Sequence, residues 1–212
     1  MQYGSLPSLE SFQKHYLPCL QTICRLLGAL ISARRSSRPS EGHIQQFLVA
    51  AFLEVHRKRY GHSISTHHPH ASDTSDGTAG DIEEFREGNL VAAYEVTVRN
   101  DWKNRLADFG KKAAKGGLSK YILIASNVRN DAHLYPAASL MNFIGKLEFD
   151  LAVIDIQDFF CVFCAELRRD ELAHAFNRTY EFLADNKLCG RHEYQEAYKK
   201  ITDSWLEQPL GL

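Results

Sequence analysis

Two stretches near the N-terminus carry apolar residues at steps of three and four, the spacing of one face of an α-helix. The first spans Leu9–Ser32 and the second spans Glu41–Arg59, with Ser40 as the expected N-cap. Apolar positions of the second helix form one stripe, made of Ile44, Phe47, Leu48, Ala51 and Val55. Between the helices, Ala33–Pro39 is basic, rich in Ser and ends in Pro, which predicts a linker.

The pattern changes to strands in the middle of the chain. Two strand-like runs, Asp81–Phe85 and Leu90–Val98, flank a segment whose Gly-Asn pair favours a hairpin turn. A helix follows over Asp101–Lys115, and Lys120–Ser126 is apolar on both faces, as a buried strand should be. Ser63–Thr66 alternates and predicts a further strand before a polar loop.

A strand, a helix of this length and a second buried strand predict a parallel pair joined by a right-handed crossover. A helix near Pro136–Lys146, a strand at Leu151–Ile156 and two or three helices over Gln157–Glu207 complete the chain. We therefore expect an α/β fold, a mixed sheet flanked by helices. The expected parts are a helical segment with a basic linker (1–39), a core (40–156) and a C-terminal helical segment packed on that core (157–212).

Composition adds few constraints. The 212 residues are 44% hydrophobic and 24% charged, enough to bury a core without disulfides, and the formal net charge is -1. Any contact with nucleic acid must therefore come from a local basic patch. Five cysteines are an odd number, and no signal peptide or membrane span is visible, so a cytoplasmic location is expected. Cys161 and Cys164 are expected to be buried core thiols.

Two carboxylates stand out within the predicted hairpin. Asp81 opens a strand after Gly80, and Glu95 lies in the middle of the apolar run VAAYEVTV. A carboxylate in an apolar central strand costs several kcal/mol (~2–7) unless it is paired or bound to a cation. Oxygen ligands on adjacent strands suit Mg²⁺, which binds through one or two carboxylates and a substrate phosphate. The pair therefore predicts a metal-assisted reaction at a phosphate.

This arrangement resembles the PD-(D/E)xK nuclease superfamily, which includes most type II restriction endonucleases. Gly80-Asp81 matches the first acid, and Glu95-Val96-Thr97 matches the Glu-x-Lys position. The resemblance implies a Mg²⁺ site, open to Mn²⁺, formed by Asp81, Glu95 and the backbone carbonyl of Val96. It also implies double-stranded DNA as substrate and a homodimer, since cutting both strands of a palindromic site calls for two-fold symmetry.

The sequence departs from the family pattern at Thr97, where the lysine is expected. Thr97 can fill that role only in part, by hydrogen bonding. The cation could instead come from Arg99 or from a lysine of the following helix, namely Lys103, Lys111 or Lys112. A non-catalytic DNA-binding or structural protein that retains a degenerate nuclease fold is the alternative.

Further candidates surround this pair. The helix Glu41–Arg59 offers Glu54 or Gln45 to the metal site, and Glu54 equally fits a solvated helix edge. DNA contacts are expected from the residues after the hairpin, although lysines on such a helix often serve solubility alone; the candidates are Arg99, Trp102, Lys103, Arg105 and Lys115. The cluster His67-His68-Pro69-His70 suggests zinc but lacks a cysteine partner nearby, so a polar loop beside the cleft is favoured.

Overall fold

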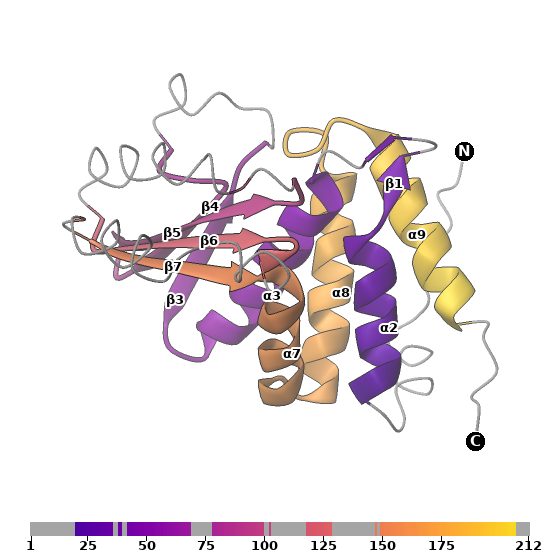
Figure 1. Ribbon diagram of the computed structural model, residues 1–212, viewed down its shortest axis with the longest axis horizontal. Helices are drawn as coiled ribbons and strands as arrows, with labels where there is room; N and C mark the ends of the chain where they lie inside the picture. Colours follow the sequence, from indigo (N-terminus) through magenta and orange to yellow (C-terminus); the bar gives the residue numbers. More distant parts are fainter. Residues whose placement is uncertain are drawn as a thin grey trace.

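The computed structural model describes residues 20–35, 38–39, 42–68, 78–99, 102, 118–128, 147 and 149–206. Its centre is a five-stranded sheet in the order β3-β4-β5-β6-β7. Figure 1 shows the described helices gathered to one side of these strands. The predicted α/β fold, a mixed sheet flanked by helices, is confirmed.

The first three strands of the sheet form an antiparallel meander. They are β3 (His62–Thr66), β4 (Ile82–Arg86) and β5 (Asn89–Thr97). The turn between β4 and β5 consists of Glu87 and Gly88, with φ of 52° and 79°, rather than the Gly-Asn pair that the sequence suggested. Positive φ at both central residues is the geometry that matches the right-handed twist of a hairpin.

The last two strands run parallel to β5 and to each other. They are β6 (Lys120–Ala125) and β7 (Asp150–Asp155). The predicted helices at 101–115 and 136–146 lie outside the described residues, apart from Trp102. β5 is thus the central strand, paired with β4 on one side and β6 on the other.

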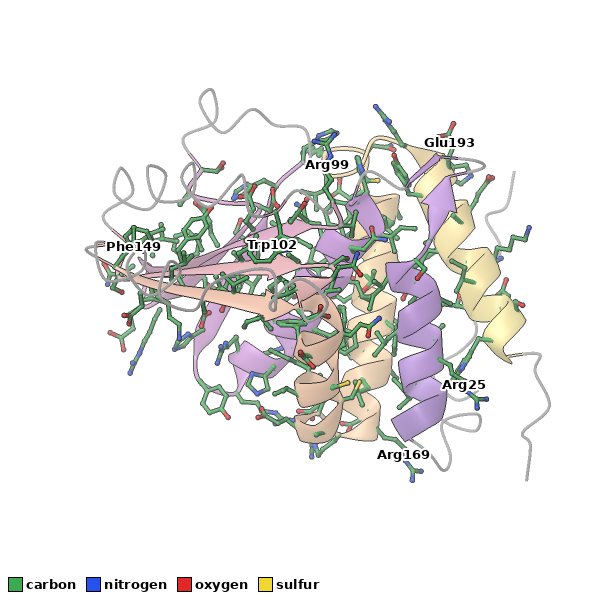
Figure 2. The ribbon with its side chains drawn as sticks, viewed as in Figure 1. Arg25, Arg99, Trp102, Phe149, Arg169 and Glu193 are labelled. Atoms are coloured by element: carbon green, nitrogen blue, oxygen red, sulfur yellow. The ribbon has the colours of Figure 1, made fainter. Side chains whose placement is uncertain are left out.

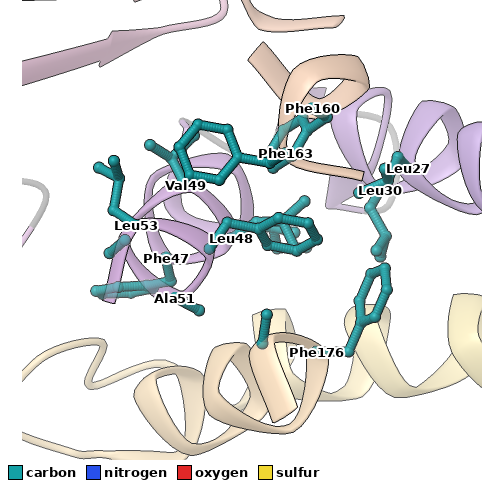
Figure 3. Packing of buried hydrophobic residues seen from close by; sticks show 14 of the residues in the cluster. Leu27, Leu30, Phe47, Leu48, Val49, Ala51, Leu53, Phe160, Phe163 and Phe176 are labelled. Carbon is teal, nitrogen blue, oxygen red and sulfur yellow. The ribbon is translucent and has the colours of Figure 1, made fainter. Parts of the chain in front are cut away.

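Helix α3 (His43–Lys58) is the most buried helix of the core. It begins after Gly42, whose φ of 87° suits glycine, and not after the predicted cap Ser40, which is outside the described residues. Aromatic rings from α7 and α8, among them Phe160 and Phe176, pack around it (Figure 3). Phe52 of α3 meets both of these rings edge to face. Burial of each such ring stabilises the fold by about 1.5–3 kcal/mol.

Three helices form the C-terminal segment: α7 (Ile156–Glu166), α8 (Arg169–Ala184) and α9 (His192–Leu206). The predicted strand Leu151–Ile156 ends one residue early, because Asp155 accepts a hydrogen bond from the Gln157 N–H (3.0 Å) and caps α7. In α7, Cys164 is buried, but Cys161 is exposed, contrary to the prediction.

The N-terminal part of the described chain contains α2 (Leu20–Ile31), which packs on α7 and α9. The segment predicted to be a linker forms a short antiparallel pair, β1 (Arg34–Arg35) and β2 (Arg38–Pro39). Within the described ranges, no helix is both long and apolar enough to cross a membrane.

The sheet has a separate apolar cluster on each face. Side chains of a strand alternate between faces, so Tyr94 and Val96 join the large cluster under the helices, whereas Ala93 joins a smaller one opposite. The smaller cluster contains Ala79, Trp102, Leu118, Tyr121 and Leu123. Glu95 and Thr97 share the face of Ala93 by the same alternation, so the candidate acid lies on the face away from α3.

Candidate active site

Asp81 lies one residue before β4, beside the peptide that follows Glu95. Its Oδ2 accepts a hydrogen bond from the Val96 N–H at 2.9 Å. The register Ile82↔Tyr94, carried one step further, sets Asp81 opposite Glu95. The two acids predicted from the sequence are therefore brought together at the start of β4 and in β5.

Gly80 allows this close approach. A Cβ at this position would lie 2.8 Å from the carbonyl oxygen of Tyr94 and 3.4 Å from the Cβ of Ala93. The first distance is shorter than real Cβ contacts. The chain before Asp81 can therefore lie directly on β5 only because residue 80 has no side chain.

Glu95 is 6% exposed, in the central strand. The Tyr121 hydroxyl donates a hydrogen bond to its Oε2 at 3.2 Å. A buried carboxylate is expensive to keep charged, and hydrogen bonds such as this one offset part of that cost. A bound cation would stabilise the charged form further, and this is the arrangement expected of a metal ligand.

Gln46 connects α3 to Asp81, the first acid. The sequence did not predict this contact. Gln46 Nε2 lies 3.3 Å from the carbonyl oxygen of Asp81, 2.8 Å from that of His67 and 3.3 Å from Thr66 Oγ1. Gln46 is 3% exposed, so its amide fixes the junction between β3 and β4 from the helix side. Neighbouring glutamines look alike in the sequence, so only the rotation of the helix distinguishes them.

The structure places the two predicted helix candidates elsewhere. Gln45 donates to the carbonyl oxygens of Leu30 (3.2 Å) and Ile31 (2.7 Å), at the end of α2. Glu54 accepts hydrogen bonds from Arg178 Nε at 3.1 and 3.0 Å. Glu54 also lies about 12 Å further along the helix axis than Gln46. Its carboxylate holds α3 to α8 instead of facing the acids.

Thr97 occupies the position of the family lysine and is 4% exposed. Its Oγ1 accepts a hydrogen bond from the Arg99 N–H at 3.3 Å, and its carbonyl oxygen accepts from the Ser126 N–H at 3.0 Å. The hydroxyl is thus used at the end of its own strand. Metal binding by the Val96 carbonyl stays a prediction.

The candidates for DNA contact divide into three groups. Arg99 is exposed just after β5, and Figure 2 shows it at the upper margin of the view. Trp102 is 4% exposed and packs in the smaller apolar cluster, so the structure places it in the core and not on a DNA-facing surface. The others lie outside the described residues, namely Lys103, Arg105, Lys111, Lys112 and Lys115.

Glu83 is a third acid near the pair, and the sequence did not predict it. Glu83 and Glu84 are neighbours in the sequence, and only the strand register shows which of the two shares the face of Asp81. Glu83 is 8% exposed; its Oε1 accepts from the Ala79 N–H (2.7 Å), and its Oε2 bonds His67 Nε2 (2.9 Å). Burial raises the pKa of Glu83, but the hydrogen bonds from His67 and Ala79 outweigh it and lower that pKa below its ordinary value. Glu83 is therefore an ionised acceptor.

The described residues contain no group of three or more His, Cys, Asp and Glu side chains that could hold a metal ion. A zinc site usually needs three or four protein ligands, so this part of the chain does not build one around His67 and His68. Mg²⁺ keeps several waters and needs only one or two carboxylates. The pair Asp81 and Glu95 fits the second requirement.

Helix α3, an antiparallel meander and a parallel fourth strand form an α/β core consistent with that of restriction endonucleases. Residues 29–126 match the family model of the SacI restriction endonuclease C-terminal domain. This range includes α3, β3 to β6 and both acids, and it supports a restriction endonuclease family. Among the curated proteins, none matches the chain.

Proposed function

We propose that this chain is a Mg²⁺-dependent endonuclease that hydrolyses phosphodiester bonds of double-stranded DNA, as a type II restriction endonuclease of the PD-(D/E)xK superfamily. The observation that carries the proposal is the pair of acids, with Asp81 Oδ2 bonded to the peptide that follows Glu95. The match of residues 29–126 adds independent support, since both acids fall within it.

The residues present fit the ion that this activity needs. Asp81 and Glu95 supply hard carboxylate oxygens on adjoining strands, and the Val96 carbonyl would add a third oxygen. When bound, Mg²⁺ would activate a water and offset charge on the scissile phosphate. Mn²⁺ is expected to substitute.

In the reaction, the oxygen of the attacking water bonds to phosphorus while the bond from phosphorus to the leaving sugar oxygen breaks. One water proton passes to solvent, and the sugar oxygen takes a proton from solvent. Asp81 and Glu95 would hold the ion, and their place on adjoining strands would fix where the phosphate lies. Tyr121 keeps the Glu95 carboxylate oriented, and Gln46 holds the backbone of Asp81.

We also propose that the protein acts as a homodimer, because two copies of one site are needed to cut both strands of a palindromic sequence. With a formal net charge of -1, DNA is expected to be held by local cations. Among the residues that the structure describes, Arg99, exposed after β5, is the candidate for contact with DNA. The lysines after Trp102 remain candidates for the cation that the family lysine would supply.

The test is digestion of a complex DNA with Mg²⁺, comparing the wild type with Asp81→Ala and Glu95→Ala. Discrete bands are expected from the wild type, whereas a smear would indicate a nonspecific nuclease. Each variant should lose cleavage while its melting temperature stays within a few degrees of the wild type, about 1 kcal/mol or less. Glu196→Ala, an exposed acid on α9, is the control and should cleave normally. Cleavage that persists in either variant would remove that residue from the mechanism.

A non-catalytic protein with the same fold is the second candidate, and Thr97 in the lysine position favours it. Metal binding separates the two. A ligand at 100 times its Kd stabilises the native state by about 2.7 kcal/mol. For a chain of this length, that is a rise in melting temperature of roughly 5–11 °C. No rise with Mg²⁺ or Mn²⁺, together with intact DNA, would refute the enzyme.

A further inference from the structure

His67 and Glu83 form a bonded pair beside the two acids. His67 follows β3, and its N–H donates to the carbonyl oxygen of Asp81 at 3.2 Å. Carrying the registers Thr66↔Ile82 and Ile82↔Tyr94 one step further sets His67, Asp81 and Glu95 in one row across three strands. Adjacent strands are about 4.8 Å apart. His67 is therefore a close neighbour of the candidate metal site.

The carboxylate of Glu83 fixes which nitrogen of His67 carries the proton. An ionised carboxylate can only accept hydrogen bonds, and Glu83 already accepts from the Ala79 N–H. The 2.9 Å contact with Glu83 Oε2 therefore requires a proton on His67 Nε2. In the neutral ring, Nδ1 then holds a lone pair.

Nδ1 is available to a ligand. The side chain of His67 is 26% exposed, so solvent reaches it. Nδ1 has no hydrogen-bond partner in the part of the chain that the structure describes. By contrast, the Thr97 hydroxyl is bonded to the Arg99 N–H. Thr97 is also neutral where the family has a lysine, while a fixed acceptor lies on the other side of Asp81 from Glu95.

We propose that His67 is a catalytic residue that orients the attacking water through a hydrogen bond accepted at Nδ1, and that Glu83 is the positioning residue that sets its tautomer. This inference rests on the proposed function. It replaces the orienting role of the family lysine and needs only a lone pair at a fixed place. Carboxylate partners commonly set a catalytic or ligating histidine in this way.

Two substitutions of His67 separate its nitrogens. His67→Gln keeps an N–H donor near the place of Nε2 for Glu83 but has no acceptor at the place of Nδ1. His67→Asn keeps an acceptor near the place of Nδ1 and loses the bond to Glu83. We expect kcat to fall about 10²- to 10³-fold in the Gln variant and by less in the Asn variant. DNA affinity measured in EDTA should stay unchanged in both.

Glu83→Gln tests the tautomer without metal or catalysis. The amide oxygen would accept from the Ala79 N–H, which leaves its NH₂ facing His67 Nε2. Nε2 must then accept, so the proton moves to Nδ1 and blocks it. Imidazole ¹⁵N NMR of the metal-free protein should show Nε2–H in the wild type and Nδ1–H in the variant. An Nδ1–H ring in the wild type would overturn the proposal.

His62→Gln is the matched control. His62 begins β3, the strand that His67 follows, and it bonds a buried glutamate, Glu84, on the opposite face of the sheet. The His62→Gln variant should cleave at the wild-type rate.

Wild-type kcat in His67→Gln, while Asp81→Ala and Glu95→Ala are inactive, would overturn this inference and leave the proposed function standing. No cleavage by the wild type would overturn both. If His67→Gln has a clearly lower melting temperature than the wild type, the kcat of Glu83→Gln is the deciding measurement. A lower kcat would support the role of His67 in orienting the water, and a wild-type kcat would refute it.

Discussion

Gly80→Ala tests whether the close approach of the chain to β5 positions the acids. The new Cβ would lie 2.8 Å from the Tyr94 carbonyl oxygen. That oxygen belongs to the peptide leading into Glu95, and residue 80 directly precedes Asp81. The added methyl group must therefore push the two acids apart.

The expected size of the effect follows from opposing contributions. Replacing glycine by alanine where no left-handed backbone is needed gains about 0.4–1 kcal/mol from the unfolded state. Overpacking against a backbone atom costs about 1–3 kcal/mol. We expect the free energy of unfolding to fall by roughly 1–2 kcal/mol, and the melting temperature to fall by about 2–8 °C. Cleavage should fall about 10- to 100-fold, because catalysis is sensitive to displacements below 1 Å.

The control is Gly28→Ala in α2, where a Cβ would meet nothing within 4 Å. In a helix, this change should stabilise by about 0.8–1 kcal/mol and leave cleavage unchanged. Thermal melting and plasmid digestion give both values. A Gly80→Ala protein that melts and cleaves like the wild type would show that the contact does not position the acids.

The other predictions concern the links between elements. Hydrogen bonding to Arg59 lowers the pKa of Glu171 from 4.5 to about 2, so its stabilisation is fully present above pH 4.5 and is lost as pH falls towards 2. Glu171→Gln should therefore melt roughly 1–4 °C lower at pH 7; an equal deficit near pH 2 would contradict this cause. Tyr94→Phe removes the hydroxyl that donates to buried Glu84 and should cost about 1–3 kcal/mol in urea unfolding. Glu84 Oε1 also contacts Arg57 Nε at 3.4 Å and His62 Nδ1, and no cost would mean that these two contacts suffice to stabilise the carboxylate. Glu54→Gln should cleave normally because Glu54 binds Arg178; inactive but folded protein would return Glu54 to the metal site.

The sequence alone predicted the parts of this protein that depend on local pattern. Apolar residues at steps of three and four identified α3, alternation identified β3, and a run that is apolar on both faces identified β6. Glu95 was identifiable because a charge within an apolar run is costly wherever the strand lies. Asp81 followed from its place at the start of the neighbouring strand.

Contacts between elements were decided by the tertiary structure. α3 is buried on nearly all sides, so its apolar stripe did not fix which residue meets Asp81, and packing selected Gln46 over Gln45 and Glu54. Trp102 was predicted as a DNA contact beside basic residues, yet it is buried in the smaller apolar cluster.

The pairing of His67 with Glu83 likewise depends on the register between β3 and β4. The sequence between these two strands did not predict that register. A shift of one residue would exchange Glu83 for Glu84 and turn every side chain to the other face of the sheet. Local pattern thus indicated Asp81 and Glu95 as candidate site residues. The tertiary structure determined which residues meet, because the contacts depend on register and helix rotation, and these are set by packing the whole core.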